Sequence, residues 1–197
     1  MGNPERPQPL PVGDDCAAVD ADNDVAVIRL PSNTIPLLSH KRFLELSDVA
    51  FDVEIDDWYC VLFGYLWEGS KPSRDFSQLL LHNYRYWTRQ YQGRISADSY
   101  DKSRHLLVEY HQSSWSMPDG VQVANPSSLG GISGSSLWRI FQPHHVEDGW
   151  SDRLAKVVGV ENVVYNNRII RCTRWKEVLP LLKNLEPSLF GRFRNNC

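Results

Sequence analysis

The sequence predicts a mostly β protein that ends in a single helix. Short apolar or alternating segments recur along the chain, and turn-forming residues separate them. No long helix alternates with these segments, whereas apolar residues from Trp175 to Leu185 fall at helical spacing. Many short strands followed by one terminal helix are typical of an all-β barrel or sandwich.

Composition excludes several classes of protein. The chain has 197 residues, of which 42% are hydrophobic and 23% charged, so we expect a folded chain rather than a disordered one. The net charge of -3 disfavours a nucleic-acid partner, and no apolar run reaches the roughly 20 residues that cross a membrane. The N-terminus has no apolar signal region, so a cytoplasmic location is expected.

Cysteine usage points the same way. The four cysteines are far apart and form no Cys-x-x-Cys pair: Cys16, Cys60, Cys172 and Cys197. A disulfide framework or a zinc site is therefore not expected. We expect reduced thiols, no metal and no cofactor.

In the first half of the chain, the proline-rich residues 1–15 have no periodicity and read as a tail. The segment DVAVIRL, residues 24–30, predicts a buried strand that Pro31 ends. Residues 31–57 predict a connector with short extended pieces. Residues 58–67, WYCVLFGYLW, predict a core strand in which Gly64 marks a bend or a close backbone approach.

The second half contains further strands and the helix. The expected strands are a long or bent one at 78–93, a half-buried one at 105–112, and others at 135–141, 154–165 and 168–175. The last two are joined by the turn dipeptide Asn166-Asn167. In the terminal helix, Pro180 predicts a short or kinked element.

The loop Gly131-Ile132-Ser133-Gly134 places a hydroxyl between glycines and directly before a strand. Acyl transfer by serine needs an exposed hydroxyl, a base, and N–H donors for the oxyanion. A glycine-rich loop supplies the first, and the amides of Gly131 and Ser133 can supply the third. An ordinary turn is the alternative interpretation of the same residues.

A family resemblance supports the catalytic interpretation. Asp24 opens the strand DVAVIRL and precedes the Gly-x-Ser-Gly loop, an order that resembles the last two triad members of chymotrypsin/trypsin-like serine peptidases. Residues 58–67 are similar to the first strand of that family's second barrel. The segment LAKVVGVEN, residues 154–162, resembles its cleft-lining strand after the nucleophile. Cysteine usage is closest to the bacterial intracellular members.

The resemblance spans residues 20–185 and implies a double β-barrel whose first barrel is incomplete. Residues 1–50 would be a tail and a remnant of the first barrel, 51–174 the second barrel with the nucleophile loop, and 175–197 the C-terminal helix and tail. It implies that Ser133 is the nucleophile, that Asp24 orients the base, and that Gly131 and Ser133 form the oxyanion hole. The remaining implied contacts are Ser127 and Ser128 near the specificity pocket and Val160, Glu161 and Asn162 at the cleft edge. No Asp stands beside Ser127 and Ser128, so a preference for basic side chains is not supported.

The family's base is a histidine that precedes the Asp, and this sequence has none there. All six histidines follow Asp24: His40, His82, His105, His111, His144 and His145. Of these, His40 is the candidate for a substitute base, and Asp48 is the alternative to Asp24 as the acid of the triad. We therefore expect part of the first barrel to be missing and peptide hydrolysis to be severely impaired, because triad members act as a unit.

Three explanations fit the missing base: a truncated gene product, a pseudoenzyme that binds peptide or protein partners, or a first half supplied by a separate chain. A non-catalytic regulatory module on the same fold is the alternative function. An α/β-hydrolase is disfavoured because Gly-Ile-Ser-Gly-Ser is not Gly-x-Ser-x-Gly. Residues 84–91 interleave arginine with aromatics, as single-stranded nucleic-acid sites do, but a two-faced strand explains them more simply. No nucleic-acid or membrane partner is expected.

Overall fold

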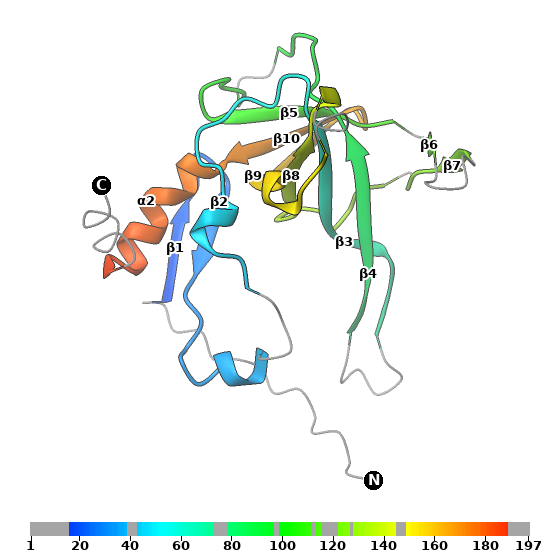
Figure 1. Cartoon of the computed structure of the whole chain (residues 1–197). Helices are drawn as coiled ribbons and strands as arrows, with labels where there is room; N and C mark the ends of the chain where they lie inside the picture. Colours follow the sequence, from blue (N-terminus) through cyan, green and yellow to red (C-terminus); the bar gives the residue numbers. More distant parts are fainter. Residues whose placement is uncertain are drawn as a thin grey trace.

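Six antiparallel strands form one curled sheet, shaped like half a barrel (Figure 1). The computed structural model describes residues 16–38, 43–72, 79–96, 99–111, 113–115, 122–126, 128–144 and 149–188. In spatial order the strands are β4 (Leu79–Thr88), β3 (Tyr59–Pro72), β8 (Ser136–Phe141), β9 (Lys156–Tyr165), β10 (Ile169–Arg174) and β5 (His105–Glu109). The predicted mostly β chain with a C-terminal helix is confirmed.

The two edge strands of this sheet approach each other beyond β4. The Tyr91 N–H donates to the Leu107 carbonyl at 2.9 Å, and the Glu109 N–H donates to the Arg89 carbonyl at 3.0 Å. These bonds join the end of β4 to β5, so backbone groups that an open sheet would leave unpaired are satisfied there.

Strand β3 shows how the sheet separates its two faces. Cys60, Leu62 and Leu66 are 0%, 0% and 1% exposed and belong to the core, to which all six strands contribute. Gly64 lies on the same face, and a Cβ there would fall 1.6 Å from the Ser135 Oγ. The missing side chain therefore lets the chain before β8 pack directly on β3, as expected for a close backbone approach.

The expectation that β5 is half buried is wrong. Its residues from His105 to Val108 are all buried, because the segment before it covers the second face. The ring of Tyr100 lies 6.1 Å from the His105 ring, and the His105 Nδ1 accepts a hydrogen bond from the Asp101 N–H at 3.0 Å.

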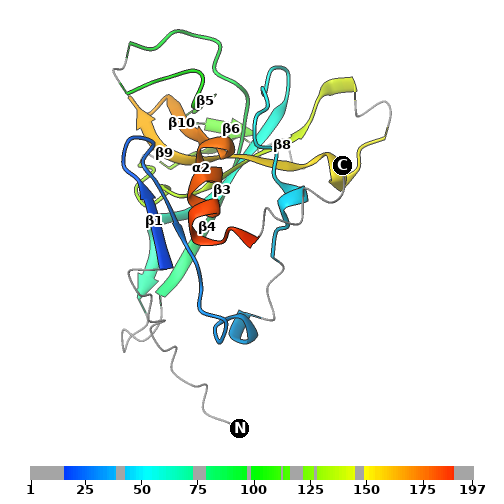
Figure 2. The same cartoon turned by 90° about the vertical axis from the view of Figure 1, so that its left-hand side faces the viewer.

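A two-stranded hairpin of β1 (Ala17–Asp20) and β2 (Val25–Ile28) lies beside helix α2 (Trp175–Leu185), as two views show (Figures 1 and 2). The Arg29 Nη1 donates to the Leu185 carbonyl at 3.1 Å. The helix continues through Pro180. Val178 and Leu181 are buried on either side of the proline, and this packing offsets the one lost backbone bond.

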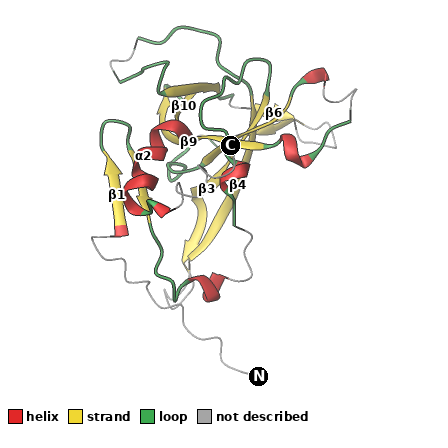
Figure 3. Ribbon diagram, turned by 60° about the vertical axis from the view of Figure 1, so that its left-hand side comes forward, coloured by secondary structure: helices red, strands yellow, loops and turns green. Residues whose placement is uncertain are grey.

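Short elements complete the fold (Figure 3). They are the strand pair β6 (Ser113–Trp115) and β7 (Gln122–Ala124) and the 3₁₀ helices η2 (Ile35–Leu38), η3 (Leu46–Asp48) and η4 (Asp152–Leu154). The connector after η3 joins the sheet through the Ala50 N–H, which donates to the Val157 carbonyl at 2.9 Å. The Arg174 Nη2 lies 3.0 Å from the Glu54 carboxylate and fixes the connector against the start of α2.

Asn23 attaches the hairpin turn to the sheet. Its backbone carbonyl accepts from the Asn162 Nδ2 at 3.0 Å and from the Thr173 Oγ1 at 2.8 Å. The Arg171 Nε donates to the Asn162 Oδ1 at 3.1 Å. All four residues are buried, so each of these polar groups depends on its partner for hydrogen bonding.

We predict that Thr173→Val destabilises the chain by about 1 to 3 kcal/mol, because it leaves the buried Asn162 amide without one acceptor and the Asn23 carbonyl without one donor. The exposed Ser47→Ala is the control and should change the free energy of unfolding by less than about 0.5 kcal/mol. Urea denaturation of both variants is the measurement. Equal midpoints would contradict the proposed role of this attachment.

Candidate functional site

Ser133 is exposed at the tip of a tightly folded loop. The flanking Gly131 and Gly134 have φ values of 85° and 87°, in the left-handed region that favours glycine. The Gly134 N–H donates to the Glu161 carbonyl at 2.9 Å, and the Ser135 N–H donates to the Ile132 carbonyl at 2.9 Å. These bonds hold the loop to β9 while the hydroxyl faces solvent.

Two backbone N–H groups of this loop have no acceptor in the described part of the chain: those of Gly131 and Ser133. Their neighbours are paired, as the Ile132 N–H donates to the Leu129 carbonyl at 3.1 Å. Both residues line a cavity of about 280 Å³, together with Phe63 and Tyr65. An oxyanion requires N–H donors that are free to bind it, and these two are the candidates beside the Ser133 hydroxyl.

Strand β3 packs against the loop and forms a backbone hydrogen bond with it. The Trp67 N–H donates to the Gly130 carbonyl at 2.8 Å. A Cβ on Gly131 would lie 2.8 Å from the Trp67 backbone nitrogen, closer than real Cβ atoms come. Gly131 is thus required twice, by its positive φ and by this close approach.

Asp24 lies exposed in the turn between β1 and β2, with a φ of 52°. It directly follows Asn23, which the sheet holds. Its carboxylate lies near enough to Glu161 to raise the pKa of that side chain. Because the Glu161 backbone bonds to Gly134 and Ser135, Asp24 and the Ser133 loop both lie beside the same residue of β9.

The other implied site residues lie in different surroundings. Val160 is half-buried, whereas Glu161 and Asn162 are buried, and the Asn162 side chain is committed to the hairpin attachment. Ser128 is exposed, and its Oγ accepts from the Gly130 N–H at 3.2 Å. Ser127 lies outside the described residues.

Glu161 is the unusual group of this region. It is 1% exposed, and within the described chain neither carboxyl oxygen has a hydrogen-bond partner. Burial and, second, the charge of Asp24 raise the pKa of Glu161 to about 7, while Arg171 acts in the opposite direction. Periodicity alone gives no signal for this burial, because apolar residues of β9 lie both before and after the Glu161-Asn162 pair.

Three histidines have described side chains, and none of them lines the Ser133 cavity. His105 is 2% exposed, and its burial lowers its pKa to about 4. His144 lines a separate cavity with Trp58 and Arg89. His40, His145 and the side chain of His82 lie outside the described residues. The structure therefore brings no described imidazole to Ser133.

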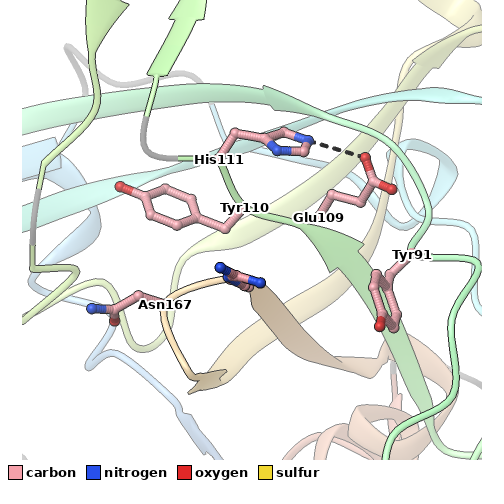
Figure 4. A pocket seen from close by; sticks show the side chains of 6 residues that line it. Tyr91, Glu109, Tyr110, His111 and Asn167 are labelled. Carbon is pink, nitrogen blue, oxygen red and sulfur yellow. Dashed lines mark hydrogen bonds and ion pairs between the residues drawn. The ribbon is translucent and has the colours of Figure 1, made fainter.

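His111 belongs to a cavity of about 410 Å³ whose lining residues are Tyr91, Glu109, Tyr110, His111, Asn167 and Arg168 (Figure 4). Its Nε2 lies 3.1 Å from the Glu109 carboxylate, and Tyr91 stands on the far side of Glu109 in this view. This pair resembles the base and acid of a triad in chemistry, but among the described residues no serine lines the cavity.

Within the described ranges, no three His, Cys, Asp or Glu side chains gather closely enough to hold a metal ion. Among the helices described, none has the length and apolar character needed to cross a membrane. Comparisons with protein-family models, curated protein sequences and solved structures give no significant match to this chain.

Two glycine variants test the loop geometry. Both Gly131→Ala and Gly134→Ala force a side chain into the left-handed region, at a cost of about 1 kcal/mol. At Gly134 a Cβ meets nothing within 4 Å, whereas at Gly131 it meets the Trp67 backbone. We predict that Gly131→Ala is the more destabilising variant by a further 1 to 3 kcal/mol or so in chemical denaturation. Equal losses would contradict the close approach.

Glu161 gives a pH-dependent prediction. As the pH rises from about 4.5 to about 7, the unfolded chain loses this proton while the folded chain keeps it, so the folded chain becomes less stable. Glu161→Gln removes the effect, and its stability relative to the wild type should increase over this window by on the order of 3 kcal/mol and then stay constant.

The difference between variant and wild type is the quantity to measure, because His105 acts in the opposite direction. The pKa of His105 is about 4 against an ordinary 6.5, so its contribution increases stability as the pH rises between these values. Urea denaturation at several pH values, with the exposed Asp152→Asn as control, isolates Glu161. A difference independent of pH would show that Glu161 is ionised normally.

Proposed function

We propose that this chain is a domain of the chymotrypsin/trypsin-like serine peptidase type, directed at a peptide or protein, with Ser133 as its nucleophile. In this proposal the curled sheet corresponds to the second barrel, and the β1–β2 hairpin is the remnant of the first. The observation that supports it is the cavity in which an exposed Ser133 adjoins two backbone N–H groups that have no acceptor among the described residues. This arrangement supports two of the three requirements of acyl transfer, the exposed hydroxyl and the N–H donors.

Each residue has a role in the proposed reaction. The Ser133 Oγ attacks the carbonyl carbon of the bound peptide and forms a tetrahedral intermediate. The N–H groups of Gly131 and Ser133 donate to its oxyanion. The hydroxyl proton passes to a base, which then protonates the leaving amine. Asp24, on the neighbouring turn, orients that base.

The base is the part of the proposal that the described residues do not supply. None of the described histidines lines the cavity, and Asp24 is not among the described residues that line it. Hydrolysis is therefore severely impaired in the chain alone, because loss of the base costs several orders of magnitude in rate. A separate chain that completes the first barrel is the proposed source of a base.

A second function is a non-catalytic module that binds peptide or protein on the same fold. One observation favours it: within the described part of the chain, the Ser133 hydroxyl makes no hydrogen bond. A hydroxyl without a base remains a weak nucleophile.

Fluorophosphonate labelling separates the two functions. We expect slow labelling confined to Ser133, located by mass spectrometry of the modified peptide. Ser133→Ala should abolish it, whereas Ser47→Ala, at an exposed serine outside the site, should retain it. The residual rate arises from the oxyanion donors, as in triads that lack their base.

No labelling of the folded chain would contradict the peptidase proposal and favour the binding module. Equal labelling of Ser47 and Ser133 would mean that Ser133 is not activated at all.

A further inference from the structure

The outer surface of β3 and β4 carries large aromatic side chains exposed to solvent. Phe63, Tyr65 and Trp67 of β3 are 36%, 45% and 71% exposed, and Trp87 of β4 is 51% exposed. With Arg85, these residues are called the aromatic face. Exposed apolar surface that extends over several residues commonly marks an interaction site.

The aromatic face is continuous across the two strands. In the sheet register Phe63 lies opposite Arg85, and Val61 lies opposite Trp87. Directly opposed side chains are neighbours, with Cβ atoms about 5 Å apart. The rings of Phe63 and Tyr65 meet edge to face, with centroids 6.5 Å apart. Neither residues 59–67 nor residues 83–89 include an acidic side chain, so arginine sets the charge of this surface.

The aromatic face leads directly to the Ser133 loop. Phe63 and Tyr65 line the same cavity as Ser133 and Gly131. Trp67 is bonded through its backbone to Gly130, so its exposed ring extends from the strand beside that loop. A molecule that reaches Ser133 through this cavity therefore contacts the aromatic face.

We propose that the aromatic face binds an extended segment of the polypeptide held at Ser133, one with apolar or aromatic side chains at alternate positions and an acidic side chain at Arg85. The strand geometry suits an extended chain laid along β3: alternate side chains of any strand repeat every 6.4 to 6.8 Å or so, and Phe63, Tyr65 and Trp67 are alternate residues of β3. The chemistry of the aromatic face supports the side chains proposed for the bound peptide, because exposed rings pack on apolar groups and arginine pairs with carboxylates. The inference deepens the proposed function and rests on it.

A polypeptide fits this surface better than a single-stranded nucleic acid. Nucleic-acid sites combine stacking rings with a groove that carries many positive charges. Here residues 83–89 contribute two exposed arginines, Arg85 and Arg89, and the whole chain has a net charge of -3. Apolar contact is thus the larger attraction that this surface offers.

The test measures binding by fluorescence anisotropy in the full chain carrying Ser133→Ala, so that no probe reacts. The probe is a fluorescein-labelled ten-residue peptide that alternates Phe with Ser and contains one Asp. The comparison probes are the same peptide with every Phe replaced by Ser, and fluorescein-labelled oligo(dT). In this background Trp67→Ala and Tyr65→Ala remove rings of the aromatic face. Trp150→Ala, at a tryptophan that is 49% exposed outside the face, is the matched control.

We expect the Phe-containing peptide to bind, and Trp67→Ala and Tyr65→Ala each to weaken binding by about tenfold or more, as ring truncation at contact sites does. Trp67→Phe, which keeps a ring, should recover most of the loss, and Trp150→Ala should bind as its parent does. Circular dichroism verifies that each variant is folded. Unchanged affinity in both ring variants, no binding of the Phe peptide up to 1 mM or so, or preference for oligo(dT) would each overturn the proposal.

Failure of the aromatic face and failure of the peptidase proposal have different signatures. Peptide binding that depends on Trp67, without fluorophosphonate labelling of the wild type, means that the face serves a binding module. Labelling at Ser133 with no dependence of binding on Trp67 or Tyr65 leaves the peptidase proposal standing and removes the aromatic face from it.

Discussion

The candidate site depends on two hydrogen bonds that the Asn23 carbonyl accepts from Asn162 and Thr173. Two hydrogen bonds from buried side chains fix the turn of a two-stranded hairpin that is too small to be stable alone. Asp24 is the next residue, so its position beside β9 follows from this attachment. Together with the packing of the hairpin against α2, this attachment defines where the Asp24 carboxylate lies relative to the Ser133 loop.

Residue 161 of β9 is the point at which the hairpin and the loop meet. Its backbone forms hydrogen bonds with Gly134 and Ser135, while the charge of Asp24 raises the pKa of its buried carboxyl group. A buried acid without hydrogen-bond partners costs stability when it ionises. Groups with displaced pKa values often gather at functional sites. Here the residue with the displaced pKa, Glu161, lies beside the loop that carries the exposed Ser133.

Strand β3 supplies both the core and the surface that surrounds the site. One face carries Cys60, Leu62 and Leu66 into the core, and the gap at Gly64 receives Ser135. The other face presents Tyr65 and Trp67 to solvent. Burying one row of a strand fixes the direction of the other row, so the packing that stabilises the sheet also determines where the aromatic rings stand relative to Ser133.

The sequence by itself determined the main strands, the terminal helix and the Gly-Ile-Ser-Gly loop, because alternation and glycine placement are local properties of the chain. Tertiary structure decided the rest. Asn23 and Asn162 are 139 positions apart, and no periodicity predicts such a contact. The alternation in β3 separates two rows of side chains, but it does not say which row faces the core. Strand β5 is buried on both faces only because residues 99–104 lie over it. Burial of Glu161 likewise depends on the packing of the hairpin and β10 against β9. These segments are distant in sequence, so local patterns do not encode their packing.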